Sequence, residues 1–306
     1  MSPPGSSSYS LSTNYYSLSS SSNRQTVGLI AGFGRGPLLV AQGMRAAGLR
    51  VVILGLKGLA SPRLRGLADE FRWVGITRIG SWLAALARAG ATEAVMIGGV
   101  KKGEIYSPFR LLRYIPDIRT AWLWYVRVRK DKRDNAVLLA VADELRKEGI
   151  ELVSSVKYCP QHLADEGLMT STPVPRSCEE DIEFGWRIAR ASAALDIGQS
   201  IAVKERDIIA VEAVEGTDAM IRRAGELCRV GGWTLIKVAR PGQDMRFDVP
   251  TVGPSTIRNL RDARCSCLVV EAGKTVIVDK PDTLALADKL GLAVLGKQAE
   301  GVAGGQ

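Results

Sequence analysis

Four side chains able to act on a phosphate lie within one short segment of this 306-residue chain. The segment RPGQDMRFDVPTVG, residues 240–253, holds Gln243, Asp244, Arg246 and Asp248 between prolines and glycines that disfavour ordinary helix. Carboxylates can hold a hard cation or orient water, and a guanidinium can pair with phosphate through two hydrogen bonds. These residue types predict attack by water on a phosphoryl group.

The geometry of this segment has two interpretations. An extended segment would place Asp244, Arg246 and Asp248 on one face, because side chains alternate along a strand. The alternative is a surface turn in which Arg246 forms a salt bridge with a neighbouring aspartate. Either way we expect an exposed loop, shaped by its prolines and glycines. Whether Asp248 is a metal ligand or a general base stays open.

The sequence offers few other groups for hydrolysis. Its one histidine, His162, allows neither a His-rich metal cluster nor a separate Ser–His–acid triad. Its five cysteines have no framework spacing and favour free thiols in a reducing compartment. We therefore expect carboxylates with Mg²⁺ to carry the chemistry, and Asp244 and Asp248 are the candidate metal ligands.

A glycine-rich loop follows the first apolar run. AGFGRGP, residues 31–37, contains Gly32 and Gly34, which let the backbone approach a phosphate at the start of the next helix. The spacing is not GxGxxG, and Lys57 follows the second strand where NAD binding needs an acid. The loop therefore predicts a site for a nucleotide-diphosphate conjugate, completed by the glycine pair at 98–99. The alternative is a tight turn that binds nothing.

Residues 101–133 are basic and aromatic. Ten Lys or Arg minus three acidic residues give +7 of the chain's formal +9. Leu111-Leu112 and Trp122-Leu123-Trp124 favour a lipid surface over single-stranded RNA, although a solvated basic face over core aromatics is the alternative. We expect peripheral contact of residues 105–130 with inner-membrane lipid and no nucleic-acid partner. No run of about 20 apolar residues suggests a membrane span.

The elements that must position these groups form two α/β domains. Strands and helices alternate in the first half, which is typical of a Rossmann-like parallel sheet. The predicted elements there are strands at 27–32, 50–56 and 93–100, a helix after the glycine loop, a helix at 81–91, and a helix and strand within 134–153. The second half predicts a smaller mixed α/β domain. Its elements are a helix at 181–194, a hairpin and helix within 197–227, strands at 234–240 and within 267–280, and a helix at 281–292.

These elements give the domain boundaries. A disordered Ser-rich tail occupies 1–25, the Rossmann-like domain 26–158, a proline-containing linker 159–176, the C-terminal catalytic α/β domain 177–298, and a flexible tail 299–306.

Several motifs occur in unbroken order along the chain. They are GLIAGFGRGPL (28–38), LDIGQSIAV (195–203), VEGTDAMIRRAGEL (214–227), KVARPGQDMRFDVPTVGPSTI (237–257) and DKLGLAVLG (288–296). Together they resemble the UDP-2,3-diacylglucosamine pyrophosphatases of the LpxI type, over residues 26–297.

The resemblance implies a two-domain, homodimeric, Mg²⁺-dependent hydrolase. With the cysteines and the basic segment, we expect it in the cytoplasm, in peripheral contact with the cytoplasmic face of the inner membrane. It would cleave UDP-2,3-diacylglucosamine to UMP and 2,3-diacylglucosamine 1-phosphate (lipid X) in lipid A biosynthesis. Asp248 matches the family's critical aspartate, and we expect Asp244 and Arg246 to act with it. The expected substrate contacts are Gly32, Gly34, Arg35, Gly98, Gly99, Val100, Thr217, Asp218, Lys237 and Gln243.

The chain also departs from the family pattern. Phe33 and Arg35 interrupt a run of glycines, Arg240 stands where the family has lysine, and Asn135 replaces an acid. Two functions outside the hydrolase class remain alternatives. One is an enzyme that uses a nucleotide cofactor, and the other is a non-catalytic lipid- or RNA-binding protein.

Overall fold

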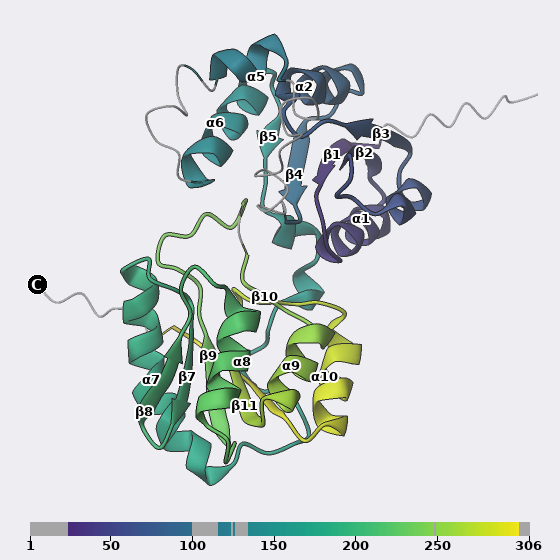
Figure 1. Cartoon of the computed structure of the whole chain (residues 1–306). Helices are drawn as coiled ribbons and strands as arrows, with labels where there is room; N and C mark the ends of the chain where they lie inside the picture. The colour runs from purple at the N-terminus through teal and green to yellow at the C-terminus, as the bar shows by residue number, and fades with distance from the viewer. Residues whose placement is uncertain (1–23, 100–115, 124, 126–133, 248, 300–306) are drawn as a thin grey trace, which may run out of the picture.

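A computed structural model describes residues 24–99, 116–123, 125, 134–247 and 249–299. Two α/β halves lie one above the other in Figure 1, which confirms the expected fold class. Asp248, Val100, most of the basic and aromatic segment, residues 1–23 and residues 300–306 lie outside the described residues. The domain boundaries stay predictions.

The first half is built on a five-stranded parallel sheet of order β3-β2-β1-β4-β5. Its strands are β1 (Thr26–Ala31), β2 (Arg50–Leu56), β3 (Glu70–Val74), β4 (Glu93–Ile97) and β5 (Glu151–Leu152). The strand order reverses between β1 and β4. Doubly wound folds bind ligands at the carboxyl ends of the strands beside such a reversal.

Helices cover both faces of this sheet. The helix α1 (Gly36–Ala46) packs on one face with the 3₁₀ turn at Pro62–Leu67. The helices α2 (Ile79–Arg88) and α6 (Asp134–Lys147) pack on the other, together with α5 (Ile118–Leu123). Adjacent β1 residues pack on opposite faces of the sheet, because side chains alternate along a strand. Leu29 packs in the core beneath α1, and Ile30 packs in the core beneath α2 and α6.

The second half is built on a six-stranded mixed sheet of order β6-β13-β11-β9-β7-β8. Its strands are β6 (Gly167–Leu168), β7 (Ser200–Lys204), β8 (Asp207–Val211), β9 (Trp233–Lys237), β11 (Cys265–Glu271) and β13 (Ala293–Lys297). The helix α7 (Arg176–Ala194) covers one face (Figure 1). The helices α8 (Thr217–Leu227), α9 (Pro254–Asp262) and α10 (Lys280–Lys289) cover the other.

The strands β8, β9, β11 and β13 of this sheet run in the same direction. Because β7 is antiparallel to both of its neighbours, β8 and β9 end at the same edge of the sheet. A separate pair, β10 (Thr251–Val252) and β12 (Val276–Ile277), lies beside α9 and α10. The loop at 240–253 begins shortly after β9 ends at this carboxyl edge of the sheet.

Some elements differ from their predicted bounds. The helix predicted at 181–194 begins at Arg176, and the strand predicted at 234–240 ends at Lys237. The strands β3 and β13 and the helix α9 were not predicted. Within the described part of the chain, no helix has the length and apolar character needed to cross a bilayer.

Candidate functional site

Two glycine loops meet at the carboxyl edge of the first sheet. The backbone N–H of Gly32 donates to Ile97 O at 2.9 Å, and Phe33 and Gly99 exchange backbone hydrogen bonds at 2.9 Å each. A Cβ atom on Gly32 would lie 2.8 Å from Gly98 O. Glycine at 32 and 98 is therefore required for the two backbones to approach. Gly34 is exposed, with φ of +113°, and a Cβ atom there would meet no atom within 4 Å.

Arg35 links this loop to the second half. Its Nε donates to Asp279 Oδ2 at 2.9 Å, and its Nη2 donates to Asp279 Oδ1 at 3.0 Å. Asp279 precedes α10 in the left-handed conformation, with φ of +46°. Arg35, predicted as a substrate contact, is therefore engaged in an ion pair between the two halves.

The segment at 240–253 is a turn at its polar centre and not a strand, so the extended interpretation is wrong for the described residues. Residues 245–247 form a turn in which Phe247 N donates to Asp244 O at 3.0 Å. The Asp244 carboxylate accepts from the backbone N–H of Arg246 at 3.0 Å and from its guanidinium at 2.5–3.0 Å. A short side chain that bonds the backbone two residues on stabilises a turn, and this pattern competes with extended structure.

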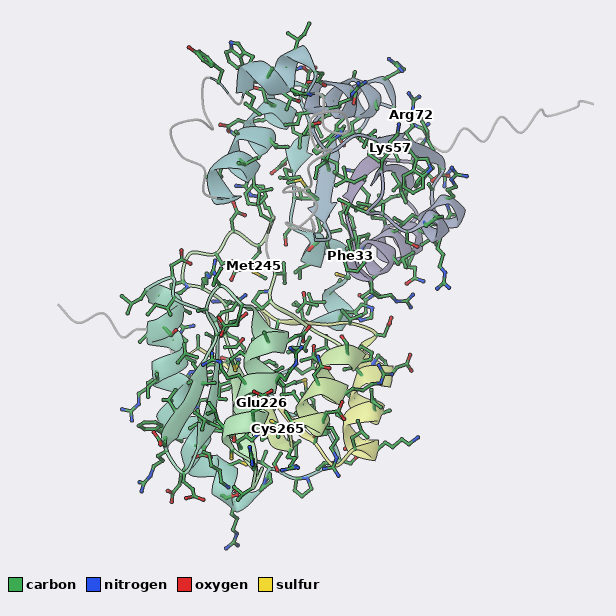
Figure 2. All side chains as sticks on the ribbon, viewed as in Figure 1. Phe33, Lys57, Arg72, Glu226, Met245 and Cys265 are labelled. Atoms are coloured by element: carbon green, nitrogen blue, oxygen red, sulfur yellow. The ribbon has the colours of Figure 1, made fainter. Side chains whose placement is uncertain are left out.

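The same turn reaches the first half of the protein. Met245 O accepts from Ser154 Oγ at 2.8 Å, and Phe247 packs against the core that contains α2 and α6. Figure 2 shows Met245 where the two halves meet, with Phe33 at the facing edge of the first half. The segment at 240–253 therefore belongs to the second half and also contacts the first, so its position depends on how the two halves are packed together.

The ion pair favours the ionised form of Asp244. The Arg246 guanidinium holds the pKa of Asp244 below its usual value, although partial burial opposes this. Both carboxylate oxygens of Asp244 already accept hydrogen bonds from Arg246, so a metal ion there would share the carboxylate with the guanidinium or displace it. Within the described ranges, no group of three His, Cys, Asp or Glu side chains is placed to hold a metal. The predicted Mg²⁺ site includes Asp248, which lies outside the described residues, so it stays a prediction.

Gln243 presents a donor in the same loop. Its Oε1 accepts from the backbone N–H of Arg240 at 2.9 Å, which leaves the amide nitrogen directed elsewhere. That buried Nε2 has no hydrogen-bond partner among the residues that the structure describes. A buried, unpaired donor is costly and is expected to meet a ligand or water.

A polar chain crosses the carboxyl edge of the second sheet. Lys237, at the end of β9, donates through Nζ to Thr217 Oγ1 at 2.8 Å, and Thr217 Oγ1 lies 2.8 Å from Glu212 Oε1. Glu212 follows β8, and Thr217 begins α8. Lys237 and Glu212 are buried, with exposed fractions of 5% and 8%. The structure thus brings together two predicted contacts, Thr217 and Lys237, with an acid that was not predicted.

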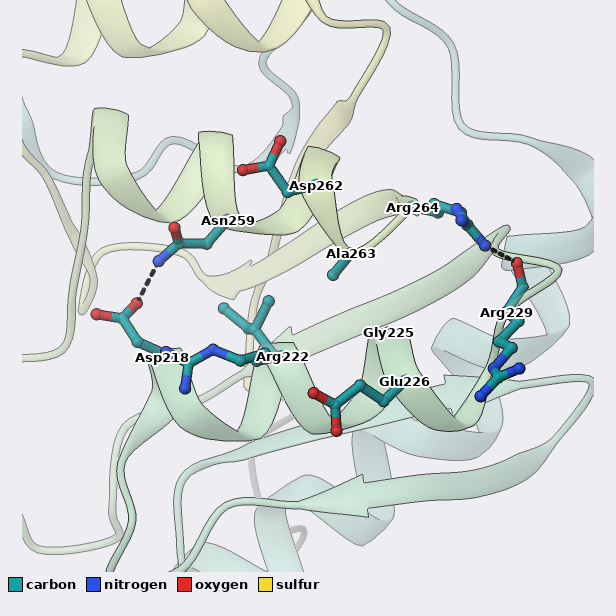
Figure 3. A pocket seen from close by; sticks show the side chains of 10 residues that line it. Asp218, Arg222, Gly225, Glu226, Arg229, Asn259, Asp262, Ala263 and Arg264 are labelled. Atoms are coloured by element: carbon teal, nitrogen blue, oxygen red, sulfur yellow. Dashed lines mark hydrogen bonds between the residues drawn. The ribbon is translucent and has the colours of Figure 1, made fainter.

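Asp218 is directed away from this chain. Its Oδ1 accepts from Asn259 Nδ2 on α9 at 3.0 Å, as Figure 3 shows. It lines a groove of about 570 Å³ between α8 and α9. Charges of both signs line the groove: Asp218, Arg222, Glu226, Arg229, Asp262 and Arg264. Asp218 therefore connects two helices, apart from Thr217 and Lys237.

Sequence reasoning did not identify Glu212, Glu271, Asp279 or Ser154 as part of the site. Glu271 is fully buried at the end of β11, where it accepts from Arg190, Lys274 and the backbone N–H of Ala239. The signal that could have identified it is an acid directly after an apolar run, CLVVE. Glu212 has the same signal, since it follows IIAV. Both acids end strands that share one sheet edge.

Comparison with known proteins places the chain in a family. A model of the LpxI N-terminal domain matches residues 26–162, and a model of the LpxI C-terminal domain matches residues 165–295. The chain is 34% identical over 285 residues to UDP-2,3-diacylglucosamine pyrophosphatase LpxI of Caulobacter vibrioides. That alignment covers 88% of this chain and 96% of the relative.

Among solved structures, glycinamide-RNase-transformylase T from Mycobacterium tuberculosis matches 62% of this chain and 44% of its own chain. The identity is 12% and the TM-score 0.26, and these values are too low to indicate a common fold. Both domain models match in order, and the C. vibrioides relative aligns over nearly its whole length. The chain belongs to the LpxI family.

Proposed function

We propose that this chain hydrolyses the pyrophosphate bond of UDP-2,3-diacylglucosamine, releasing UMP and 2,3-diacylglucosamine 1-phosphate (lipid X) for lipid A biosynthesis. The observation that carries the proposal is the alignment with the C. vibrioides enzyme over 96% of that enzyme's length. The two-domain fold supports it, because two carboxyl edges with phosphate-compatible groups are joined by one loop.

Each half contributes groups suited to a pyrophosphate. Cleavage requires neutralisation of charge on the phosphate oxygens and a water molecule positioned in line with the leaving group. Lys237, which ends β9 and donates to Thr217 at the start of α8, would contribute positive charge from the second half, and the N-terminus of α8 adds to it. Arg35 and the open backbone at Gly34 would contribute from the first half. Gln243 Nε2 would donate a hydrogen bond from the loop.

Asp248 is the proposed catalytic carboxylate. It matches the critical aspartate of the family motif and follows the turn that both domains hold. We propose that it orients or deprotonates the attacking water, or ligates Mg²⁺. A bound Mg²⁺ would polarise the phosphoryl group and lower the pKa of a coordinated water. Asp244 would hold Arg246 in place, since its carboxylate is engaged there.

The test is hydrolysis of detergent-dispersed UDP-2,3-diacylglucosamine by the purified protein, with Mg²⁺ or with EDTA. We expect equal amounts of UMP and lipid X by mass spectrometry with Mg²⁺ and none with EDTA. Absence of turnover by folded wild type would overturn the proposal. Tight NAD(P) binding would then favour the cofactor-dependent alternative. Salt-dependent RNA binding that Asp248→Ala leaves unchanged would favour the non-catalytic one.

We also propose peripheral contact with anionic lipid through residues 105–130. The described part of this region exposes apolar side chains: Ile118 is 91% exposed, Trp122 52% and Tyr125 68%. Exposed aromatic and aliphatic groups beside basic residues are suited to a bilayer interface. Co-flotation with anionic liposomes that decreases with salt is expected, and no flotation at low salt would refute it.

A homodimer is proposed on the family resemblance alone. Light scattering should then give twice the chain mass of 32.9 kDa. A mass of one chain at micromolar concentration would contradict it.

A further inference from the structure

We propose that Glu212 is a positioning residue that holds the Lys237 ammonium against the substrate's phosphates through the hydroxyl of Thr217. The inference rests on the proposed function, because it names a group that supports the phosphate-binding lysine. The observation behind it is the buried chain of Glu212, Thr217 and Lys237, with bonds of 2.8 Å each.

Hydrogen-bonding capacity fixes the direction of this chain. An ammonium group only donates, and a carboxylate only accepts. The single hydroxyl proton of Thr217 must therefore point to Glu212 Oε1, while its lone pair accepts from Lys237 Nζ. Each bond involves a charged partner, which makes it stronger than a bond between neutral groups. The arrangement fixes the lysine head at the carboxyl edge of β9.

The sheet register places these groups in one row. Ser200, at the start of β7, pairs with Lys237 of β9. On its other side, Ser200 O accepts from Glu212 N at 2.8 Å. Residues two positions further in, Ala202, Ala210 and Leu235, all belong to the core under α8. Glu212, Ser200 and Lys237 therefore share the sheet face on which α8 packs.

Glu212 keeps one carboxylate oxygen unpaired beside the candidate substrate contacts. Its buried Oε2 has no hydrogen-bond partner within the described ranges, and neither has Ser200 Oγ. Glu271, on the neighbouring strand end, shows the contrast, since both of its oxygens accept hydrogen bonds. Buried polar groups in native proteins are paired, so an unpaired oxygen at a sheet edge that carries candidate substrate contacts needs a functional reason.

A matched control exists at the opposite edge of the sheet. Asp181, fully buried on α7, accepts through Oδ1 from the backbone N–H of Arg206 at 2.7 Å, and its Oδ2 has no partner among the described residues. Arg206 lies in the turn between β7 and β8, at the end remote from Ser200 and Glu212. Asp181→Asn therefore removes an equally buried charge far from the candidate site.

The test is a double-mutant cycle on kcat/KM for UDP-2,3-diacylglucosamine hydrolysis, with Glu212→Gln and Lys237→Met singly and together. We expect Glu212→Gln to lower kcat/KM by about 5- to 10-fold, because the glutamine amide oxygen still accepts from Thr217 but lacks the charge that strengthens this hydrogen bond. In the Lys237→Met background the same substitution should cost less than about twofold, because it acts through the lysine. Thr217→Val should reproduce the loss and Thr217→Ser should restore activity.

Several results would overturn the inference. Full activity of Glu212→Gln, equal costs in both backgrounds, or an equal loss in Asp181→Asn would each show that Glu212 does not act through Lys237. Far-ultraviolet circular dichroism of every variant identifies unfolded proteins, and the Thr217 pair decides the matter where Glu212→Gln fails to fold. If wild type shows no turnover, the proposed function fails separately. The cycle is then measured on inorganic pyrophosphate binding by calorimetry, where additive losses or no binding overturn the inference.

Discussion

Asp244 and Arg246 form an ion pair within the turn that precedes Asp248. Their proximity was among the expectations, as the alternative of a turn closed by a salt bridge. The structure has that turn, so the acid supports the arginine directly. With side-chain exposures of 33% and 32%, the pair contributes little to global stability. Its value lies in fixing the turn that leads to Asp248.

The charge state of Asp244 gives a residue-scale prediction. Its pKa is lowered by Arg246, so Arg246→Met should raise it toward the unperturbed value of about 3.9. Because the folded pKa is depressed, the stabilising effect is present above about pH 3.9 and is lost as pH falls through the folded value. Carboxyl-carbon NMR titration measures the shift.

Arg240→Met provides the comparison, because Arg240 lies 3.2 Å from Asp196 and not beside Asp244. An Asp244 pKa that is unchanged by Arg246→Met, or equally raised by Arg240→Met, would contradict the assigned ion pair.

At the scale of the element, the glycine loops after β1 and β4 contact each other. Gly32 and Gly98 were expected to face phosphate, yet a Cβ atom on Gly32 would overlap the Gly98 and Gly99 backbone at 2.8–2.9 Å. These positions serve the contact between two loops that the parallel sheet brings together. Sequence identified the loops, because glycine follows an apolar run in both. It did not reveal the contact, which depends on β1 and β4 being neighbours.

Gly32→Ala is therefore expected to destabilise the protein by about 1–3 kcal/mol, as overpacking does at sites that cannot relax. Gly99→Ala is the matched control: it lies in the facing loop, without a positive φ, and its Cβ would meet nothing within 4 Å. Urea unfolding should show a lower midpoint for Gly32→Ala and a near-normal one for Gly99→Ala. Equal midpoints would show that the loops do not approach as described.

The elements that the sequence predicted are those with strong apolar periodicity. RVVILGL is buried from Val51 to Leu56 and TLIK along its whole length, so their apolar runs are continuous. The edge strand β3, EFRWV, was missed because only Val74 is buried in it. The helix α9 was missed because only Ile257 and Leu260 of PSTIRNLRD are buried. Glu212 acquires a role only through the β8-β7-β9 order, which a single sequence does not specify.

At the scale of the whole molecule, few polar links between the two halves are seen among the residues that the structure describes. Arg35–Asp279 is one, and the turn at Met245 and Phe247 is another. If Arg35 binds phosphate as proposed, the substrate competes with Asp279 for its guanidinium. Asp279→Asn should then lower KM, while Arg35→Met should raise it. Asparagine is the suitable replacement, because it tolerates the left-handed conformation at this position.

Steady-state kinetics on both variants measure this competition. A higher KM for Asp279→Asn would contradict it and would show that Asp279 orients Arg35 for the substrate. Tm should change little in either variant, because the side chains are 44% and 25% exposed.

The five cysteines give a prediction for the folded state as a whole. All are free and buried, and burial raises the pKa of Cys159 to about 11 and that of Cys265 to about 12. Thiol reagents react with the thiolate, so native protein at pH 8 should label slowly. All five thiols should label rapidly in denaturant. Rapid labelling of native protein would contradict the described burial.

The rate of UMP release from UDP-2,3-diacylglucosamine in saturating Mg²⁺, for wild type beside Asp248→Asn, tests the central claim most directly. The account predicts turnover by wild type and a loss of about 100-fold or more in the variant, the scale expected when a group that activates water is removed. Wild-type rates in Asp248→Asn, or no UMP from either folded protein, would contradict it.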